Sequence, residues 1–286
     1  MKPDRVTRAR SLPPGGRGSH VLVLALLGVW TAFAVFPFVW AIATSLKTPA
    51  VAFAVPPAVL FEPTLAAYRE LWSGQGFDRY LFNSLSVAAA TVVISLVIAT
   101  PAAYALARSR KAAGFSLLVI ALVFRAVPRM AFVLPFYYVA RATGLYDTRV
   151  LLVAVLVAVN QPFTIWMLRG FFREVPREID EAALVDGCTP WQAFTRAVLP
   201  VATPGLLTAA LFTLLLAYNE FLVPVVLTAT DAMTLPVAIS QFGAENIKYW
   251  SIAAAGSVSI ALPIVVLVLV FQRQFVSGLT AGSVKG

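Results

Sequence analysis

The chain has 286 residues, of which 60% are hydrophobic and only 12% are charged, and its formal net charge is +9. Soluble domains are usually about 45–50% apolar and roughly 25% charged, so this composition excludes a soluble protein, which would lack the charges to cover its core. The single cysteine, Cys188, excludes an intramolecular disulfide, and the single histidine, His20, excludes a histidine-rich metal site.

Long apolar runs divide the chain into segments that fit a bilayer. A helix needs about 20 apolar residues to cross the hydrocarbon, where unsatisfied backbone groups find no partner. The predicted spans are about 21–46, 82–107, 113–137, 150–169, 202–227 and 250–272. The first is longer than the roughly 7–15 residues of a signal-peptide core, so we expect a retained anchor. The sequence thus predicts an all-α membrane protein with one transmembrane domain, 20–276.

The distribution of lysine and arginine predicts which ends of these spans face the cytoplasm. One side carries Lys2, Arg5, Arg8, Arg10, Arg17, Arg108, Arg110, Lys111, Arg169, Arg173, Arg177, Arg196, Arg273 and Lys285. The other side carries Lys47, Arg69, Arg79, Arg141, Arg149 and Lys248. We therefore expect the first side to be cytoplasmic, with cytoplasmic tails at 1–19 and 277–286. The basic residues lie between apolar runs and form no stripe interleaved with aromatics, so nucleic acid is not an expected partner.

Polar residues interrupt the third and fourth predicted spans. Arg125 and Arg129 are four residues apart, so we expect them to share one helical face of the third span, and Pro128 between them predicts a kink or a break there. These arginines are expected to line a pathway, to pair with Glu220 of the fifth span, or to support a gate. Asn160 and Gln161 precede a proline in the fourth span, and their role is equally open.

The loop between the fourth and fifth spans, 170–200, begins with signals for a short helix. Pro176 suits a first helical position, and the acidic residues Glu178, Asp180 and Glu181 favour the positive end of a helix dipole. Gly187 then suits the left-handed conformation that ends a helix.

A second short helix is predicted directly after this glycine. Thr189 is followed by Pro190 and, three residues on, by Gln192, which is the pattern of a capping box. Two short helices would therefore meet at Gly187 on the cytoplasmic side, as a docking surface requires. The alternative is a solvated helical hairpin whose charges only keep it in water.

The fifth predicted span holds one acidic residue, Glu220, flanked by Tyr218, Asn219 and Phe221. Ionisable groups inside membrane spans are costly and mark functional sites by default. The alternative is that Asn219 and Glu220 hold helices together, or hold a basic residue of a neighbouring subunit.

The loop resembles the EAA loop of ABC importer permeases, which consists of a Glu-Ala-Ala triplet, a glycine four residues later, and Leu-Pro about a dozen residues beyond. The matching residues are Glu181, Ala182, Ala183, Asp186, Gly187, Leu199 and Pro200. Further stretches are similar to the smaller permease of maltose-type carbohydrate importers: Asn83–Leu85, Ala99–Arg108, Leu134–Tyr137, Gly144–Thr148, Asn219–Leu222 and Gly278–Gly286. Tyr218 departs from that group, which usually has tryptophan there.

This resemblance implies a type I ABC importer permease fold, in which the EAA loop forms a coupling helix that docks on an ATPase. The implied partners are a second homologous permease, two ATPase subunits that hold ATP and Mg, and an extracytoplasmic substrate-binding protein. The chain itself contains no G-x-x-x-x-G-K-[ST] motif, so we expect no ATPase site, no catalytic residue and no cofactor in it.

The resemblance also implies a sugar or sugar-like substrate, with a polyol or a glycerol phosphate as alternatives. Asn219 and Glu220 offer donors and acceptors for sugar hydroxyls, and Tyr218 and Phe221 offer rings for the apolar faces of a sugar. A different class of protein, a stand-alone ion-coupled transporter, usually shows paired broken helices, internal repeats and several midplane carboxylates. Glu220 is the one carboxylate within the predicted spans, which weakens that alternative.

Overall fold

The computed structural model describes residues 17–109, 112–125, 127–242 and 249–280, and the regular structure of this part of the chain is helical throughout. Four of its helices are long and apolar enough to cross a membrane: α1 (Arg17–Ser45), α4 (Phe77–Arg108), α7 (Arg149–Glu174) and α14 (Trp250–Thr280). The all-α membrane class predicted from composition is therefore confirmed.

Two further candidate spans each belong to a pair of helices that meet at a bend. Helix α5 (Ala112–Phe124) and helix α6 (Arg129–Thr143) make an angle of 91°, and segment 190–201 makes an angle of 76° with α11 (Thr203–Tyr218). The total reaches the predicted six spans when each bent pair is taken as one.

Two predicted helices are interrupted in the structure. The third span breaks between Phe124 and Arg129, with Pro128 as the N-cap of α6, so the expected break is present. Because the break lies between them, Arg125 and Arg129 do not share one helical face, and that prediction was wrong. The fifth span, expected to continue to residue 227, ends at Tyr218 and restarts as α12 (Leu222–Leu227).

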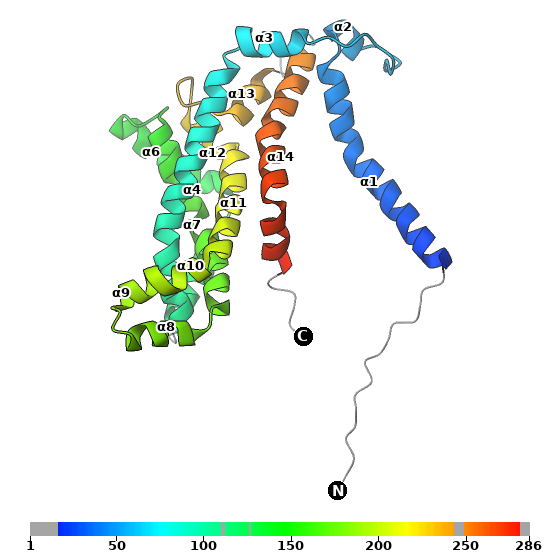
Figure 1. Ribbon diagram of the computed structural model, residues 1–286. Helices are drawn as coiled ribbons and strands as arrows, with labels where there is room; N and C mark the ends of the chain where they lie inside the picture. The colour runs from blue at the N-terminus through cyan, green and yellow to red at the C-terminus, as the bar shows by residue number, and fades with distance from the viewer. Residues whose placement is uncertain (1–16, 110–111, 126, 243–248, 281–286) are drawn as a thin grey trace.

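Short helices gather at the two ends of the long ones (Figure 1). At one end lie α2 (Pro49–Ala52), α3 (Ala66–Gly74) and α13 (Leu235–Phe242). At the other end lie α8 (Arg177–Val185), α9 (Pro190–Gln192), the π-helix η1 (Ala193–Val198) and α10 (Leu199–Val201). Of the two predicted tails, most of 1–19 lies outside the described residues, whereas 277–280 still belongs to α14 and 281–286 is not described.

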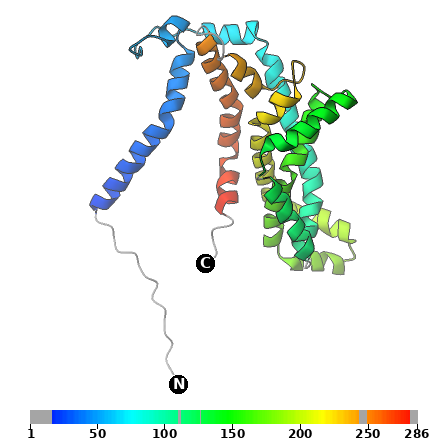
Figure 2. The same ribbon diagram turned by 180° about the vertical axis from the view of Figure 1, so that it is seen from behind.

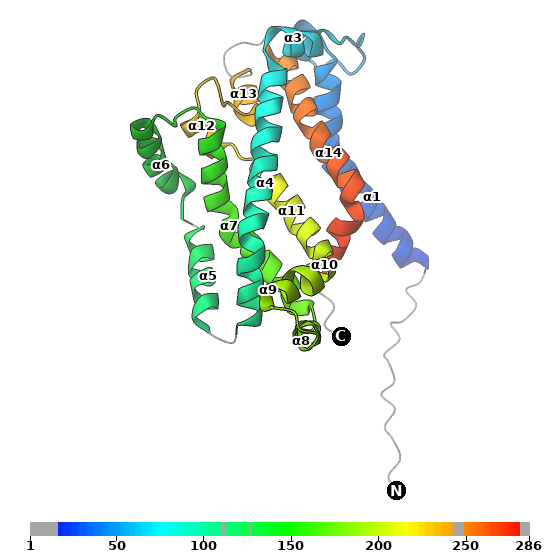
Figure 3. The same ribbon diagram turned by 60° about the vertical axis from the view of Figure 1, so that its left-hand side comes forward.

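Helices α4, α7 and α11 pack together at the centre of the fold (Figure 3). Ala88, Ala99 and Ala103 on α4 are fully buried, and small side chains let helix backbones approach closely where the hydrophobic effect does not drive association. Between α7 and α11 the hydroxyls of Thr164 and Thr213 share a buried hydrogen bond of 3.1 Å. These contacts define a central unit that carries the polar residues considered below.

Helix α1 extends away from this central unit (Figure 2). It packs against α14, and the most apolar part of α1 buries none of its residues inside the chain. Large side chains such as Leu24, Trp30 and Phe33 are exposed along it. An apolar surface of this size requires lipid or another membrane protein rather than water.

Candidate functional site

The predicted elbow between the fourth and fifth spans is present. Helix α8 ends at Val185, and Gly187 adopts a φ of +88°, which a residue with a side chain rarely adopts. The Thr189 hydroxyl accepts a hydrogen bond from the Gln192 N–H at 3.3 Å, and the Gln192 side chain accepts one from the Thr189 N–H at 2.9 Å. The capping box is therefore confirmed, whereas Pro176 is the N-cap of α8 rather than its first residue.

The outer face of the elbow combines carboxylates with apolar side chains. Glu181 and Asp186 are exposed, and so are Val185 at 87% and Trp191 at 63%. A surface that exposes a valine and a tryptophan beside acids, at the end of a membrane bundle, has the composition of a protein-docking site. We call Glu181, Ala182, Val185, Asp186 and Trp191 the docking face.

Not all seven residues of the loop pattern reach this surface. Ala182, Gly187 and Pro200 are exposed, but Ala183 is buried and Leu199 packs against a buried cluster that includes Phe172 and Phe194. Ala183, one of the residues that match the EAA loop, is therefore not available on the surface of the elbow. Its methyl group faces the chain's own core, because α8 buries that side against the spans.

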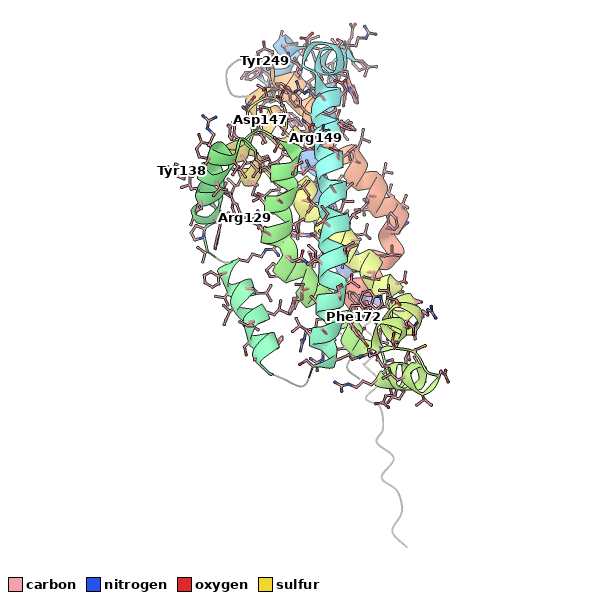
Figure 4. The ribbon with its side chains drawn as sticks, turned by 90° about the vertical axis from the view of Figure 1, so that its left-hand side faces the viewer. Arg129, Tyr138, Asp147, Arg149, Phe172 and Tyr249 are labelled. Atoms are coloured by element: carbon pink, nitrogen blue, oxygen red, sulfur yellow. The ribbon has the colours of Figure 1, made fainter. Side chains whose placement is uncertain are left out.

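A charged pair lies at the two helix breaks. Arg129 starts α6 after the first break, and its guanidinium bonds the Glu220 carboxylate at the second break. Figure 4 shows Arg129 at the junction of α5 and α6. The Glu220 side chain is 5% exposed and that of Arg129 is 41% exposed. Glu220 also accepts a hydrogen bond from the Leu222 N–H at 3.2 Å, so it caps the start of α12.

Arg125 lies near this pair and makes weaker contacts. Its guanidinium is 4.9 Å from the centre of the Phe163 ring, and its Nη2 is 3.5 Å from the side-chain oxygen of Asn160. Arg125 and Arg129 line a cavity of about 340 Å³ whose other walls are mainly apolar. The structure thus brings together Arg125, Arg129, Asn160 and Glu220 as a polar group beside an apolar cavity.

The remaining pathway candidates bond within the chain. Tyr218 is buried and its hydroxyl donates to the Ile260 carbonyl at 3.2 Å, so its ring is not free to pack against a sugar. The Gln161 amide donates to the Ser95 carbonyl at 3.2 Å. Asn219 is exposed and its amide bonds the Leu215 carbonyl at 2.9 Å, whereas Phe221 is 38% exposed.

At the opposite end, Asp147 organises a loop that the sequence did not single out. Its φ is +60°, and its carboxylate accepts backbone N–H bonds of 2.9–3.0 Å from residues 229–232. Burial alone raises the pKa of this carboxyl, but the N–H bonds from residues 229–232 outweigh it and hold the pKa at about 2. Asn83 on α4 donates to the carbonyls of Asp231 and Met233 at 2.9 Å, so the same loop is fixed from two sides.

We expect Asp147→Asn to loosen residues 229–232. Asparagine tolerates the positive φ but replaces one acceptor oxygen with a donor, so amide exchange should rise about tenfold, equivalent to about 1.4 kcal/mol. Because the folded pKa lies below the ordinary 3.8, this stabilisation is complete above pH 4 and disappears as the pH falls towards 2. Hydrogen exchange at neutral pH measures the effect. Asp231→Asn is the matched control, since that side chain is 75% exposed, and equal exchange in both variants would contradict the expectation.

The helical bundle with broken spans and an exposed elbow is that of a multi-pass membrane protein. Its fold matches that of a chain in the crystal structure of a bacterial ABC transporter involved in the import of the acidic polysaccharide alginate, with a TM-score of 0.76, 22% identity, and coverage of 92% of this chain and 100% of that one. Residues 96–280 match the profile of the binding-protein-dependent transport system inner membrane component. The chain belongs to this family.

Relatives of known family match this chain over almost its whole length. The chain is 37% identical to the probable ABC transporter permease protein y4oR of Sinorhizobium fredii, covering 90% of this chain and 95% of that protein. It is 38% identical to the trehalose transport system permease protein SugB of Mycobacterium tuberculosis, covering 94% and 98%. The chain is thus a permease subunit of a binding-protein-dependent ABC importer, located in the inner membrane.

Proposed function

We propose that this permease forms one membrane half of an ATP-driven sugar importer and couples an ATPase to the transport path through its elbow. The other half is a second homologous permease, and two ATPase subunits hold ATP and Mg. An extracytoplasmic binding protein delivers the substrate. This chain binds no cofactor and performs no chemistry of its own.

The exposed elbow is the observation that carries this proposal. It presents two carboxylates, Glu181 and Asp186, with Val185 and Trp191, beyond the ends of the membrane helices. Its turn depends on Gly187, so the angle between its two arms is set by one backbone position. These properties suit a projecting element that docks in a cleft of a partner and moves with it.

The proposed orientation places the elbow in the cytoplasm. Arg169, Arg173, Arg177 and Arg196 flank it, and short loops rich in arginine stay on the cytoplasmic side. Helix α1 begins, and α14 ends, towards the same end of the molecule (Figure 1). Both termini are accordingly assigned to the cytoplasm.

The proposed mechanism is alternating access. ATP binding closes the ATPase dimer, the docked elbows move with it, and the paired permeases open outwards to receive substrate from the binding protein. Hydrolysis returns them to the inward-facing state. The residues assigned to the path are Arg125, Arg129, Asn160 and Glu220, which meet beside the 340 Å³ cavity where two spans are broken.

The substrate class proposed is a sugar. The Mycobacterium tuberculosis relative is named for trehalose transport. Charged and amide groups such as Glu220 and Asn160 bond sugar hydroxyls, and the apolar cavity wall suits the faces of a sugar ring. A polyol presents the same hydroxyls, and a glycerol phosphate would add a charge that Arg125 can bind.

Affinity purification of the tagged chain from native membranes in mild detergent tests the proposal. We expect a second permease and an ATPase to co-purify, and the binding protein encoded with them can then be screened for its ligand. A chain that purifies alone and moves solute along an ion gradient without ATP would instead be a secondary transporter. Glu220 is the one carboxylate within the predicted spans, and it is already paired with Arg129.

A further inference from the structure

The inner side of the elbow is bonded to the spans through Arg108, the last residue of α4. Its Nη2 lies 2.6 Å from a carboxylate oxygen of Asp180 in the first turn of α8. Its Nη1 donates to the carbonyls of Phe172 and Val175, at 3.0 and 3.1 Å, where α7 ends. One guanidinium therefore joins the end of α4, the end of α7 and the start of α8. The Arg108 and Asp180 side chains are only 17% and 13% exposed, so water screens this ion pair weakly.

Tyr104 adds a second connection from the same face of α4, one turn before Arg108. Its hydroxyl donates to Asp180, and its ring lies 5.8 Å from that of Phe172 and 4.6 Å from that of Phe194. Phe172 belongs to α7, and Figure 4 shows it at this end of the bundle. Phe194 belongs to η1, the second arm of the elbow. Both arms of the elbow are thus held against α4 and α7.

The covalent connection from the elbow to α11 is different. The chain passes through η1, whose π-helical turns mark a local departure from α-helical bonding, and then bends by 76° before α11. Pro200 and Pro204 lie on either side of this bend and cannot donate backbone hydrogen bonds. The link from the elbow to α11 thus contains a bend and two prolines, whereas α8 follows α7 directly in the chain and the elbow contacts α4 through Arg108 and Tyr104.

We propose that Arg108, Asp180 and Tyr104 form a clamp that transmits the displacement of the elbow to α4 and α7. These are positioning residues, since they lie behind the docking face and none of them lines the cavity at the helix breaks. The inference rests on the proposed function. Arginine is required at position 108 because lysine, a point charge, cannot bond the carboxylate and two carbonyls in the same fixed geometry.

The test follows the movement of α7 without requiring the identity of the substrate. Val159 on α7 lines the cavity, and Val159→Cys in a Cys188→Ser background provides a single thiol there. The complex, as purified with its ATPase and second permease, is reconstituted in liposomes, and vesicles whose ATPase subunits lie in the lumen are used, with the nucleotide enclosed. A membrane-impermeant maleimide then reports thiol exposure on the extracytoplasmic side, with and without ATP plus vanadate.

With the native clamp we expect ATP plus vanadate to raise the labelling rate at least fivefold. Arg108→Lys and Asp180→Asn should reduce that rise to less than twofold while the ATPase still co-purifies and hydrolyses ATP. Tyr104→Phe keeps the ring contacts and should give an intermediate rise. Arg173→Lys, an exposed arginine at the end of α7, is the matched control and should behave as the native chain.

Two results would overturn the clamp. The first is a native labelling response in both Arg108→Lys and Asp180→Asn, which would mean that the displacement reaches α7 by another route. The second is loss of the ATPase from these variants, which would make the residues part of docking or folding instead. Failure of the proposed function looks different, because then the native chain itself would show neither a bound ATPase nor a nucleotide response.

Discussion

Glu220→Ala is expected to abolish substrate uptake and to destabilise the purified complex. Removing one partner of a buried ion pair costs about 3–5 kcal/mol, because the other charge stays behind without a counter-ion. Arg129 is 41% exposed, so water recovers part of that loss and we expect about 2 kcal/mol. Glu220 also caps α12, so its loss should loosen the second helix break. Thermal unfolding in detergent and uptake in proteoliposomes measure the two effects.

A double-mutant cycle separates the charge pair from other roles of Glu220. Arg129→Met alone leaves the carboxylate unpaired, whereas Arg129→Met with Glu220→Ala removes both charges. The double variant should be more stable than the sum of the single effects predicts, by at least about 1 kcal/mol. Arg125→Met is the matched control, since that arginine lines the same cavity without a carboxylate partner among the described residues. Strictly additive effects would show that the Arg129–Glu220 pair contributes no coupling.

The second large effect is expected at the docking face, where Glu181→Lys with Gly187→Pro should remove the ATPase from the purified complex. Lysine reverses an exposed charge of the face, and proline fixes φ near −65°, which is incompatible with the φ of +88° at the elbow turn. We expect at least a tenfold loss of co-purifying ATPase, while the second permease is retained. Quantitative mass spectrometry of the affinity-purified chain measures both.

The control for this variant is Glu174→Lys, the same charge change at an exposed position where α7 ends, outside the docking face. It should retain the ATPase. If Glu181→Lys with Gly187→Pro also retained the ATPase, the elbow would be a solvated hairpin and the ATPase would have to bind elsewhere.

Local signals made the spans and the elbow predictable. Apolar length alone marks α1, α4, α7 and α14, since the bilayer sets the required length. The elbow follows from Gly187, which adopts the left-handed conformation, and from the capping box of Thr189 and Gln192. Each of these signals acts within a few residues, so no knowledge of the tertiary structure is needed.

Contacts between distant segments were not predictable. Arg108 and Asp180 are 72 positions apart. In the sequence, Arg108 is one of the basic residues that flank the second span, and Asp180 is one of several acidic residues in the loop 170–200. Nothing in the sequence around Asp147 indicates that its carboxylate bonds residues 229–232. The pairing of Arg129 with Glu220 was one alternative among three, and the choice depends on how two broken spans meet.

Predictions about which side of a helix is exposed failed for a similar reason. Ala183 was assigned to the EAA docking loop by its motif position, and Tyr218 was assigned to the substrate path by its residue type. The structure buries both, because α8 turns one side towards the spans and Tyr218 bonds the Ile260 carbonyl on α14. Packing between elements, which a single sequence does not encode locally, decides these orientations.

Uptake by proteoliposomes tests the central claim most directly. The purified complex is reconstituted, the ligand of its binding protein is added outside in labelled form, and ATP is enclosed on the ATPase side. We predict accumulation of the ligand only with ATP and binding protein present, unchanged when ionophores collapse all ion gradients. Accumulation that needs an ion gradient and proceeds without ATP would contradict the assignment of this chain to an ATP-driven importer.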